Sequence, residues 1–366
     1  MKIAVITRHA IINYGSLLQA LATQKIIESL GHECEIIDYI RKQEHYRNIE
    51  KNILKNKQEW NKNPLKKALY LAIRQPESIF AGKKFEDERL QYLNLSEPYR
   101  TLDELYKKPP MADIYMTGSD QVWGPVENGT YDEAYTLSFT DKKKIAYAAS
   151  FGHAKLTECV KEYYKERLSK YCQVAVREDS AVALLQEMKV NALQVLDPTL
   201  LLDAELWNQY IKPIKTKEKY VLVYQLHKNK KLDEYAKKVA KNKELPIIRV
   251  SASFHQIMRV GEFKYCPCIG EFLSYIKNAE CMITDSFHGT AFAINFNIPF
   301  VEILPNNNTG TRNKSILNLT GLTDRILSDI ENVELANEKI DYTSVNTILS
   351  MERKKSIQIL EKMIKE

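Results

Sequence analysis

A histidine in the second half of the chain stands between a predicted strand and a predicted helix. His288 follows the apolar run 281–286 (CMITDS) and comes just before 289–297 (GTAFAINFN), which has the pattern of a helix start. Open α/β sheets bind ligands beyond the carboxyl ends of their strands, and the free N–H groups of a helix N-terminus bind phosphate. The position of His288 therefore predicts a phosphate ligand, a proton donor or both. The alternative is a histidine that only caps the turn.

An arginine ends another predicted strand. Arg177 lies near the carboxyl end of 173–178 (QVAVRE). Its planar guanidinium can bind a carboxylate or a phosphate through two parallel hydrogen bonds. The alternative is a surface ion pair with Glu178 or Asp179.

A small polar turn follows the first predicted strand. Gly15 would let the backbone approach a ligand, and Ser16 can cap the helix that follows. Asn13 and Gly15 are therefore expected to line a cleft. The dinucleotide fingerprint G-x-G-x-x-G is missing from this turn, so simple turn chemistry remains the alternative.

Two successive series of strands and helices must position these residues. Strands alternating with helices predict parallel α/β sheets. The expected strands are 2–6, 34–38, 112–118, 144–150, 173–178, 193–199, 219–226, 245–251, 281–286 and 299–304. A polar stretch with one proline, 204–218, is the expected hinge. We predict two Rossmann-like domains facing a cleft, at 1–207 and 208–340, and an amphipathic C-terminal helix within 341–366.

The composition excludes several classes of protein. The 366 residues suggest about two domains, and 44% hydrophobic with 27% charged residues is ordinary for a globular chain. No apolar run approaches the roughly 18 residues of a membrane span, and the N-terminus does not resemble a signal peptide. Six scattered cysteines favour a reducing cytoplasm over a disulfide framework. Their one close pair, Cys266 and Cys268, has no second pair, so no metal site is expected.

The positive charge is concentrated in one segment. Residues 41–75 hold ten Lys or Arg against three Glu, or +7, while the whole chain carries +6. Such a distribution does not indicate nucleic-acid binding. The segment belongs to a predicted helical insert at about 41–110, in which apolar residues at helical spacing are Leu65, Ala68, Leu69, Ala72 and Ile73. These apolar residues form a stripe with basic neighbours, which is open to two interpretations. The segment could contact an anionic membrane or the diphosphate of a lipid-linked acceptor. Alternatively, the stripe could pack on the first domain.

An ordered set of motifs resembles the polysaccharide pyruvyl transferase family. The matching stretches are NYGSLLQA (13–20), TGSDQVWGP (117–125), YAASFG (147–152), VAVREDSA (174–181), VLDP (195–198) and TDSFHGTAFA (284–293). The resemblance implies a GT-B-like fold. It also implies transfer of pyruvate from phosphoenolpyruvate to two hydroxyls of a sugar, forming a cyclic ketal. The expected acceptor is a glycan or a lipid-linked glycan precursor. The donor is a substrate, so no cofactor is expected.

The resemblance also assigns roles to residues. It implies His288 as the acid and Arg177 as a phosphoenolpyruvate ligand. Further substrate-binding residues are expected at Asn13, Gly15, Ser16, Ser286, Phe287 and Gly289. The family often has an arginine two residues before the histidine, where this chain has Ser286, so one expected cation is missing.

Two residues after the strand 112–118 are expected to meet the acceptor. Asp120 can take a proton from a sugar hydroxyl, and Trp123 can stack on a sugar face. The alternatives are that Asp120 caps a turn and that Trp123 belongs to the core.

Two other functions remain open from the sequence. One is a GT-B glycosyltransferase that uses a nucleotide sugar. The other is a non-catalytic member of the fold, because a fold does not fix a function; the serine at position 286 favours it.

Overall fold

The computed structural model describes residues 1–126, 130–216, 218–305 and 310–366. Its first half contains a six-stranded parallel sheet in the order β2-β1-β3-β4-β5-β6. The strands are β1 (Lys2–Ile6), β2 (Glu33–Ile36), β3 (Ile114–Thr117), β4 (Lys143–Ala149), β5 (Gln173–Val176) and β6 (Leu193–Gln194). The central residues of β1, β3, β4 and β5 are apolar and buried, as expected for strands covered on both faces.

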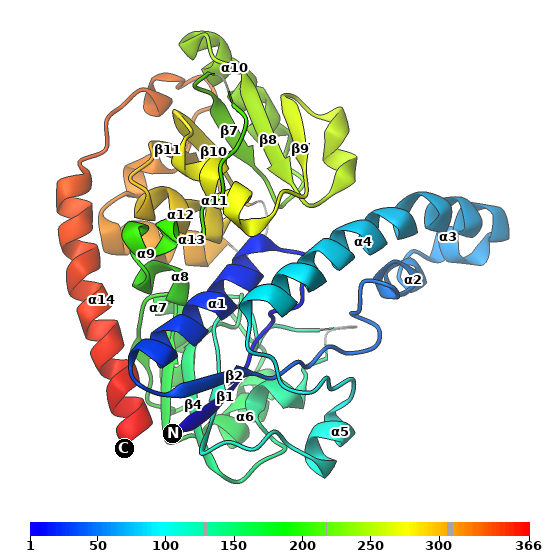
Figure 1. Ribbon diagram of the computed structural model, residues 1–366, viewed down its shortest axis with the longest axis vertical. Coiled ribbons are helices and arrows are strands. Elements are labelled where there is room, and N and C mark those ends of the chain that lie inside the picture. The colour runs from blue at the N-terminus through cyan, green and yellow to red at the C-terminus, as the bar shows by residue number, and fades with distance from the viewer. Residues whose placement is uncertain (127–129, 217, 306–309) are drawn as a thin grey trace.

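Helices connect these strands and cover the sheet (Figure 1). They are α1 (Tyr14–Ser29), α6 (Glu158–Leu168), α7 (Asp179–Glu187), α8 (Pro198–Leu201) and α9 (Ala204–Asn208), with the 3-10 turn η2 (Glu133–Thr136). Asn13 caps α1, where its side chain accepts a hydrogen bond from the backbone N–H of Gly15 at 2.8 Å. The loop 7–13 thus connects the carboxyl end of β1 to the capped first turn of α1.

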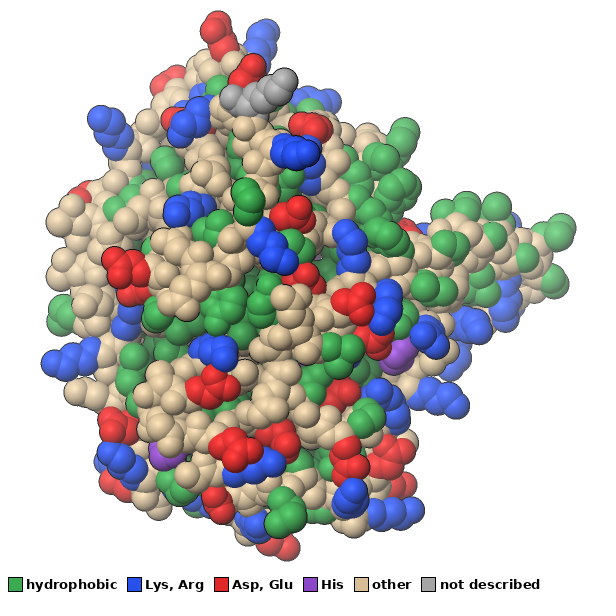
Figure 2. Space-filling model, viewed as in Figure 1, with side chains coloured by type: hydrophobic (Ala, Val, Ile, Leu, Met, Phe, Trp, Pro, Cys, Tyr) green, Lys and Arg blue, Asp and Glu red, His purple; other side chains and the backbone are tan. Residues whose placement is uncertain are grey.

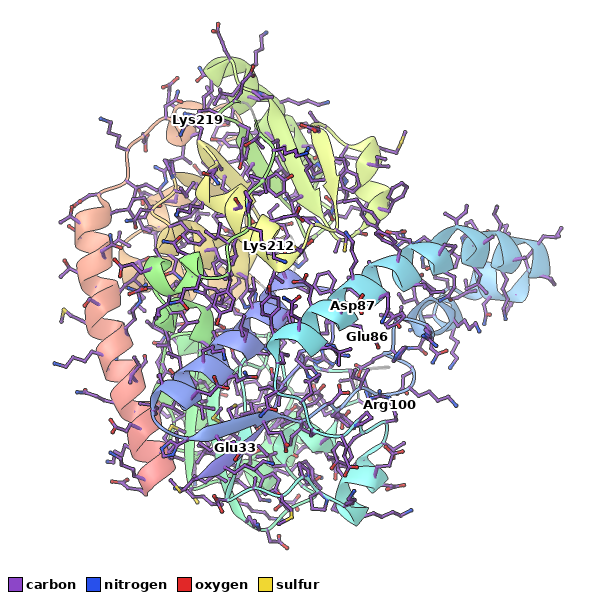
Figure 3. The ribbon with its side chains drawn as sticks, viewed as in Figure 1. Glu33, Glu86, Asp87, Arg100, Lys212 and Lys219 are labelled. Atoms are coloured by element: carbon purple, nitrogen blue, oxygen red, sulfur yellow. The ribbon has the colours of Figure 1, made fainter. Side chains whose placement is uncertain are left out.

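A helical arm is inserted after β2. It comprises α2 (Ile49–Lys55), α3 (Gln58–Lys62), α4 (Pro64–Tyr92) and the separate short helix α5 (Leu102–Lys107). Figure 1 shows the outer part of α4 extending away from both halves, with α2 and α3 beside it. Near its base α4 carries Glu86 and Asp87 (Figure 3), which both form ion pairs with Lys83.

The second half contains a five-stranded parallel sheet in the order β11-β10-β7-β8-β9. The strands are β7 (Val221–Tyr224), β8 (Ile247–Ser251), β9 (Glu262–Tyr265), β10 (Cys281–Thr284) and β11 (Phe300–Glu302). The helices are α10 (Lys230–Lys243), α11 (Ile269–Lys277), α12 (Phe287–Asn295) and α13 (Thr311–Thr320), with 3-10 turns η3 (Phe254–Met258), η5 (Thr323–Arg325) and η6 (Glu334–Ala336).

The long last helix, α14 (Tyr342–Lys365), runs from the second half back along the first (Figure 1). Ser356 Oγ accepts a hydrogen bond from the backbone N–H of Leu196 at 3.0 Å, and the Lys143 ammonium donates to the carbonyl of Ile364 at 2.9 Å. Leu349, Leu360 and Met363 are buried. The helix therefore ties the two halves together.

The halves also share one continuous apolar core. Tyr14 of α1 stacks on Phe272 of α11 with ring centroids 4.2 Å apart, and Trp207 of α9 packs against Phe292 of α12 at 5.1 Å. The predicted domain boundary at residue 207 thus falls inside α9, next to a fully buried tryptophan. The first residues of the expected hinge, 204–208, form a capped helix that packs on the second half through Trp207.

The predicted pair of α/β sheets is confirmed, with differences at the edges. Of the predicted strand 193–199, only Leu193 and Gln194 pair, because Pro198 starts α8. The strand β9 and the helix α13 were not predicted. Strand β9 (EFKY) has no fully buried residue and alternates charged with aromatic side chains, so it lacks the apolar run used to find the others.

Candidate functional site

A cavity of about 280 Å³ lies where the two halves meet. We call it the central cavity. Its walls are loops and helix starts that follow β1, β3, β7 and β10, together with the start of α13. The lining residues are Arg8, Ile11, Asn13, Ser16, Asp120, Gln121, Leu226, His227, Asp285, Ser286, Phe287, His288, Pro305, Arg312 and Asn313. The carboxyl edges of both sheets thus supply one site, as in other open α/β proteins.

His288 occupies the first turn of α12 at the wall of the central cavity. Ser286 caps this helix by accepting a hydrogen bond from the N–H of Gly289 at 3.2 Å. The imidazole is 5% exposed, and its Nε2 has no hydrogen-bond partner among the described residues. Nε2 lies 3.8 Å from Asp197 Oδ2.

The surroundings of His288 keep its ring neutral. Burial, together with the charges of Arg177 and Arg312, lowers the pKa of His288 to about 4, although Asp197 and Asp120 act in the opposite direction. At neutral pH, one ring nitrogen is therefore free to receive a proton or a hydrogen bond.

Gly15 lies directly against the His288 ring. A Cβ at position 15 would stand 2.0 Å from His288 Nδ1, a distance that no side chain can occupy. Gly15 does not itself line the central cavity. The structure therefore gives it a packing role toward His288.

Asp120 faces the central cavity from a strained turn after β3. Its φ of 77° lies in the left-handed region, which costs free energy for any residue with a Cβ and is often found at functional sites. Ser16 Oγ donates to Asp120 Oδ2 at 2.6 Å, and the N–H of Gln121 donates to Oδ1 at 2.8 Å. Burial alone would raise the pKa of Asp120, but the charges of Arg177 and His288 and the Ser16 bond bring it below its usual value. Asp120 is thus an ionised acceptor at neutral pH.

Arg177 does not line the central cavity. Its Nη1 donates to Asp197 Oδ2 at 2.8 Å, its Nε lies 3.5 Å from Glu178 Oε2, and its guanidinium packs on the ring of Phe287 at 4.5 Å. The predicted direct contact with phosphoenolpyruvate does not fit this placement. Its main partner was also missed, because Asp197 is twenty residues away in sequence and meets Arg177 only beyond the ends of the paired strands β5 and β6, where it caps α8.

Two arginines that the sequence analysis did not single out face the central cavity. Arg8 follows β1 and pairs with Glu44 at 3.3 Å; Arg312 lies at the start of α13. When the Gln121 side-chain amide is oriented with its oxygen toward Arg312, this oxygen accepts hydrogen bonds from Arg312 Nη1 at 3.2 Å and Nη2 at 2.6 Å. Burial lowers the pKa of Arg312 to about 10, so it remains a cation. Arg312 therefore supplies a positive charge to the cavity that Ser286, in place of the expected arginine, also lines.

Other predicted residues separate into two groups. Asn13, Ser16, Ser286 and Phe287 line the central cavity as expected. Gly289 does not, and a Cβ there would stand 2.6 Å from Thr284 Oγ1, so this glycine is needed for packing on β10.

Trp123 is a core residue. It is 0% exposed, packs against Phe151 and Tyr164, and donates from Nε1 to the carbonyl of Tyr135 at 3.2 Å. The ring has no free face for a sugar, so the predicted stacking is wrong for this conformation. The turn after β3 directs Asp120 to the cavity and Trp123 inward.

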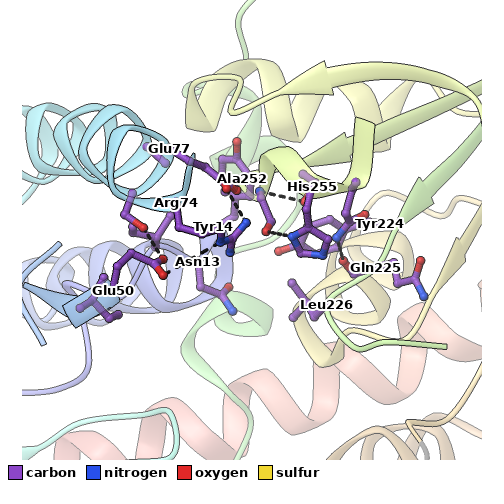
Figure 4. Close-up of a pocket in the computed structure, with 17 residues that line it drawn as sticks. Asn13, Tyr14, Glu50, Arg74, Glu77, Tyr224, Gln225, Leu226, Ala252 and His255 are labelled. Carbon is purple, nitrogen blue, oxygen red and sulfur yellow. Dashed lines mark hydrogen bonds and ion pairs between the residues drawn. The ribbon is translucent and has the colours of Figure 1, made fainter. Parts of the chain in front are cut away.

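A second cavity of about 250 Å³ adjoins the central one and shares Asn13 and Leu226 with it (Figure 4). We call it the adjoining cavity. Its polar lining comes from the arm and from the second half, and includes Glu50, Arg74, Glu77, Ser78, Gln225, Ser251, Ser253, His255 and Gln256. Many of these groups are already held in place: Ser78 Oγ donates to Glu50 Oε1 at 2.6 Å, and Ser253 Oγ lies 2.7 Å from His255 Nδ1. The wall is therefore a fixed set of donors and acceptors.

Among the residues that the structure describes, no group of three or more His, Cys, Asp or Glu is arranged to hold a metal ion. None of the helices described there is long and apolar enough to cross a membrane.

Several solved structures have a similar fold. The UDP-GlcNAc 2-epimerase of Methanocaldococcus jannaschii matches with a TM-score of 0.54 at 14% identity over 100% of both chains. The S. aureus MnaA–UDP structure matches at 0.52, with 12% identity over 95% of this chain and 90% of that one. Arabidopsis thaliana UGT89C1 complexed with UDP-L-rhamnose matches at 0.51, with 10% identity over 99% and 98%. At these identities the likeness shows only the fold, which is of the GT-B type.

Sequence comparison is more specific. Comparison with curated proteins gives no match. A family model described as polysaccharide pyruvyl transferase matches residues 13–308, well over half of the chain. The match includes eleven of the fifteen residues that line the central cavity; Arg8, Ile11, Arg312 and Asn313 lie outside it. The protein therefore belongs to the polysaccharide pyruvyl transferase family.

Proposed function

We propose that this protein transfers the pyruvyl group of phosphoenolpyruvate to two hydroxyls of one sugar, forming a cyclic ketal and releasing inorganic phosphate. The observation that carries the proposal is the convergence of His288, Arg312, Arg8 and the ionised Asp120 on one cavity. Family membership supports this chemistry, and the cavity contains residue types that it needs.

The donor requires cations and N–H donors. Phosphoenolpyruvate carries a phosphate and a carboxylate, and arginines bind both groups with charge-assisted hydrogen bonds. Arg8 and Arg312 meet this need from opposite halves, and the start of α12 adds backbone N–H groups beside His288. Arg177 contributes positive potential from behind Phe287.

The first bond-forming step needs an acid. Protonation of C3 of the enol turns C2 into an electrophile, and one sugar hydroxyl then adds to C2. His288 is the proposed donor of this proton, which it acquires as the anionic donor binds beside it. Asp120 accepts the hydrogen bond of the attacking hydroxyl and its proton, aided by Ser16.

The second step closes the ketal. A neighbouring hydroxyl of the same sugar attacks C2, the C2–O bond to phosphate breaks, and the hydroxyl proton leaves with the phosphate. One phosphoenolpyruvate and two hydroxyls thus give one ketal and one inorganic phosphate. No separate cofactor enters this balance.

The adjoining cavity is the proposed acceptor side. Sugar hydroxyls both donate and accept hydrogen bonds, and the carboxylates, amides and hydroxyls of its wall can do the same (Figure 4). Because it meets the central cavity at Asn13 and Leu226, a sugar held there reaches the donor. We also place the reaction in the cytoplasm, in keeping with six free cysteines.

The test is a product assay. The protein is incubated with phosphoenolpyruvate and a panel of glycosides that present vicinal or 4,6-hydroxyl pairs. Phosphate release is measured together with the mass gain of one pyruvyl ketal. His288→Ala should abolish both. Ligand binding without phosphate release on any acceptor would favour a non-catalytic member of the fold.

A further inference from the structure

The outer part of helix α4 carries an exposed apolar stripe. Leu65 is 82% exposed, Leu69 55% and Ile73 63%, and the spacing of four residues places them on one face. Ala68 and Ala72 lie on the same exposed face. The expected packing of this stripe on the first domain is therefore wrong.

The opposite side of the same helix explains why the stripe faces outward. Tyr70 donates to Glu50 Oε2 at 2.7 Å and Ser78 donates to Glu50 Oε1 at 2.6 Å, which fixes α4 against α2 through a buried carboxylate. These polar contacts determine the rotation of α4. Because α4 is held against α2 in this orientation, its apolar face with Leu65, Leu69 and Ile73 points into solvent.

The apolar surface continues beyond the stripe. Phe80 of α4 is 49% exposed and stacks on Tyr265 of β9, while Phe254 and Met258 of η3 are exposed on the edge of the second half. Figure 2 shows hydrophobic side chains along the arm and on this edge of the second half. Large apolar surfaces of this kind in a soluble fold mark interaction sites.

The charge of the arm identifies the partner. Segment 41–75 carries +7, and of the described residues none forms an ion pair with Lys51, Lys55, Lys62 or Lys67. Two copies of this chain meeting through their arms would bring two such charges together, so self-association through the stripe is opposed. An anionic surface neutralises the lysines while it accepts the apolar side chains.

We propose that the arm is a membrane-docking element: the stripe Leu65, Leu69 and Ile73 enters the headgroup boundary of an anionic bilayer, and the surrounding lysines bind its headgroups. The docking itself is independent of the reaction. The position of the arm adds a consequence that rests on the proposed function. Arg74 and Glu77 line the adjoining cavity, within about one helical turn of Ile73. A docked arm therefore holds the acceptor side of the site close to the lipid surface, as a lipid-linked sugar acceptor requires.

Vesicle flotation tests the docking. The full chain is mixed with phosphatidylcholine vesicles, alone or with phosphatidylglycerol, at low and at physiological salt. Binding should require phosphatidylglycerol and weaken as salt rises. A variant with Leu65→Ser, Leu69→Ser and Ile73→Ser, and a second with Lys62→Ser, Lys66→Ser and Lys67→Ser, should each bind at least about tenfold more weakly.

The matched control lies on α14, where Met351 is 67% exposed and Lys354 and Lys355 are neighbouring cations. Met351→Ser with Lys354→Ser and Lys355→Ser should bind like the wild type. Circular dichroism and phosphoenolpyruvate binding should be unchanged in all variants, which separates docking from the proposed catalysis. No flotation at low salt, or equal flotation of the stripe variant, overturns the proposal. A concentration-dependent dimer that the stripe variant loses would assign the surface to a second copy instead.

Discussion

Gly15 and His288 touch across the two halves of the molecule: the backbone of the first turn of α1 lies where a Cβ would be 2.0 Å from the His288 Nδ1 atom. The contact joins the helix after β1 of one sheet to the helix after β10 of the other. It sets both the rotation of the imidazole and the separation of the two cavity walls.

Gly15→Ala should therefore displace His288. We expect turnover to fall about 30- to 1,000-fold, the range for losing one positioned catalytic group, with a stability cost of about 1–3 kcal/mol from overpacking. Steady-state kinetics and urea unfolding measure the two effects. In a His288→Ala background the ring is gone, so Gly15→Ala should cost little more in turnover. Independent, fully additive losses would show that the contact does not act through His288.

Phosphoenolpyruvate binding should take up a proton through His288. The ring of the free protein has its pKa lowered to about 4 by burial, and a bound phosphate would favour the protonated form. Since binding raises this pKa, affinity should increase as the pH falls from 7 toward 5. Calorimetry in two buffers of different ionisation enthalpy measures the uptake. His288→Gln should lose it, and an unchanged uptake in that variant would assign the proton to another group.

Substitution of Arg312 should mainly weaken phosphoenolpyruvate binding, whereas substitution of Arg177 should mainly destabilise the fold. Arg312→Gln removes a cation that faces the cavity, so phosphoenolpyruvate should bind about 30- to 1,000-fold more weakly with little change in stability. Arg177→Gln removes the guanidinium that pairs with the buried Asp197. This substitution should lower the unfolding free energy by about 3–5 kcal/mol. Titration and chemical unfolding of both variants give the comparison. If both variants lost the same phosphoenolpyruvate affinity and the same unfolding free energy, the different positions of Arg312 and Arg177 would be contradicted.

Glu302 should make the fold less stable at high pH. Burial raises the pKa of its carboxyl to about 8, and Asn313 donates to it at 2.7 Å. The carboxyl loses its proton earlier in the unfolded chain, near pH 4.5, so its contribution to stability is full below that pH and is lost as the pH rises toward 8.

Glu302→Gln should remove this dependence and stabilise the protein at pH 8 by an amount on the order of 1–4 kcal/mol. Unfolding at pH 5 and pH 8 measures it, with the exposed Glu205→Gln as control. An identical pH profile in Glu302→Gln and the wild type would rule out Glu302 as the group responsible.

The positions at strand ends were predictable because parallel strands align their carboxyl edges. His288 and Asp120 follow apolar runs that are readily recognised, and both line the central cavity. Trp123 was misplaced because a sequence pattern does not tell which side of a turn a ring occupies.

The cations were not predictable in the same way. Arg312 lies in the first turn of α13, and Arg8 stands in an irregular loop; only the packing of one half on the other brings them together. Arg177 has the expected strand position, but its partner Asp197 is recognisable only once β5 and β6 are paired. The rotation of α4, and with it the exposure of Leu65 and Leu69, depends in the same way on the buried Glu50.

The choice between phosphoenolpyruvate and a nucleotide sugar as donor is the central claim, and titration calorimetry of the wild type and of Arg312→Gln tests it most directly. The account predicts saturable binding of phosphoenolpyruvate, about 30- to 1,000-fold weaker in Arg312→Gln, and no binding of UDP. Saturable binding of UDP with no response to phosphoenolpyruvate would contradict it and favour a nucleotide-sugar enzyme.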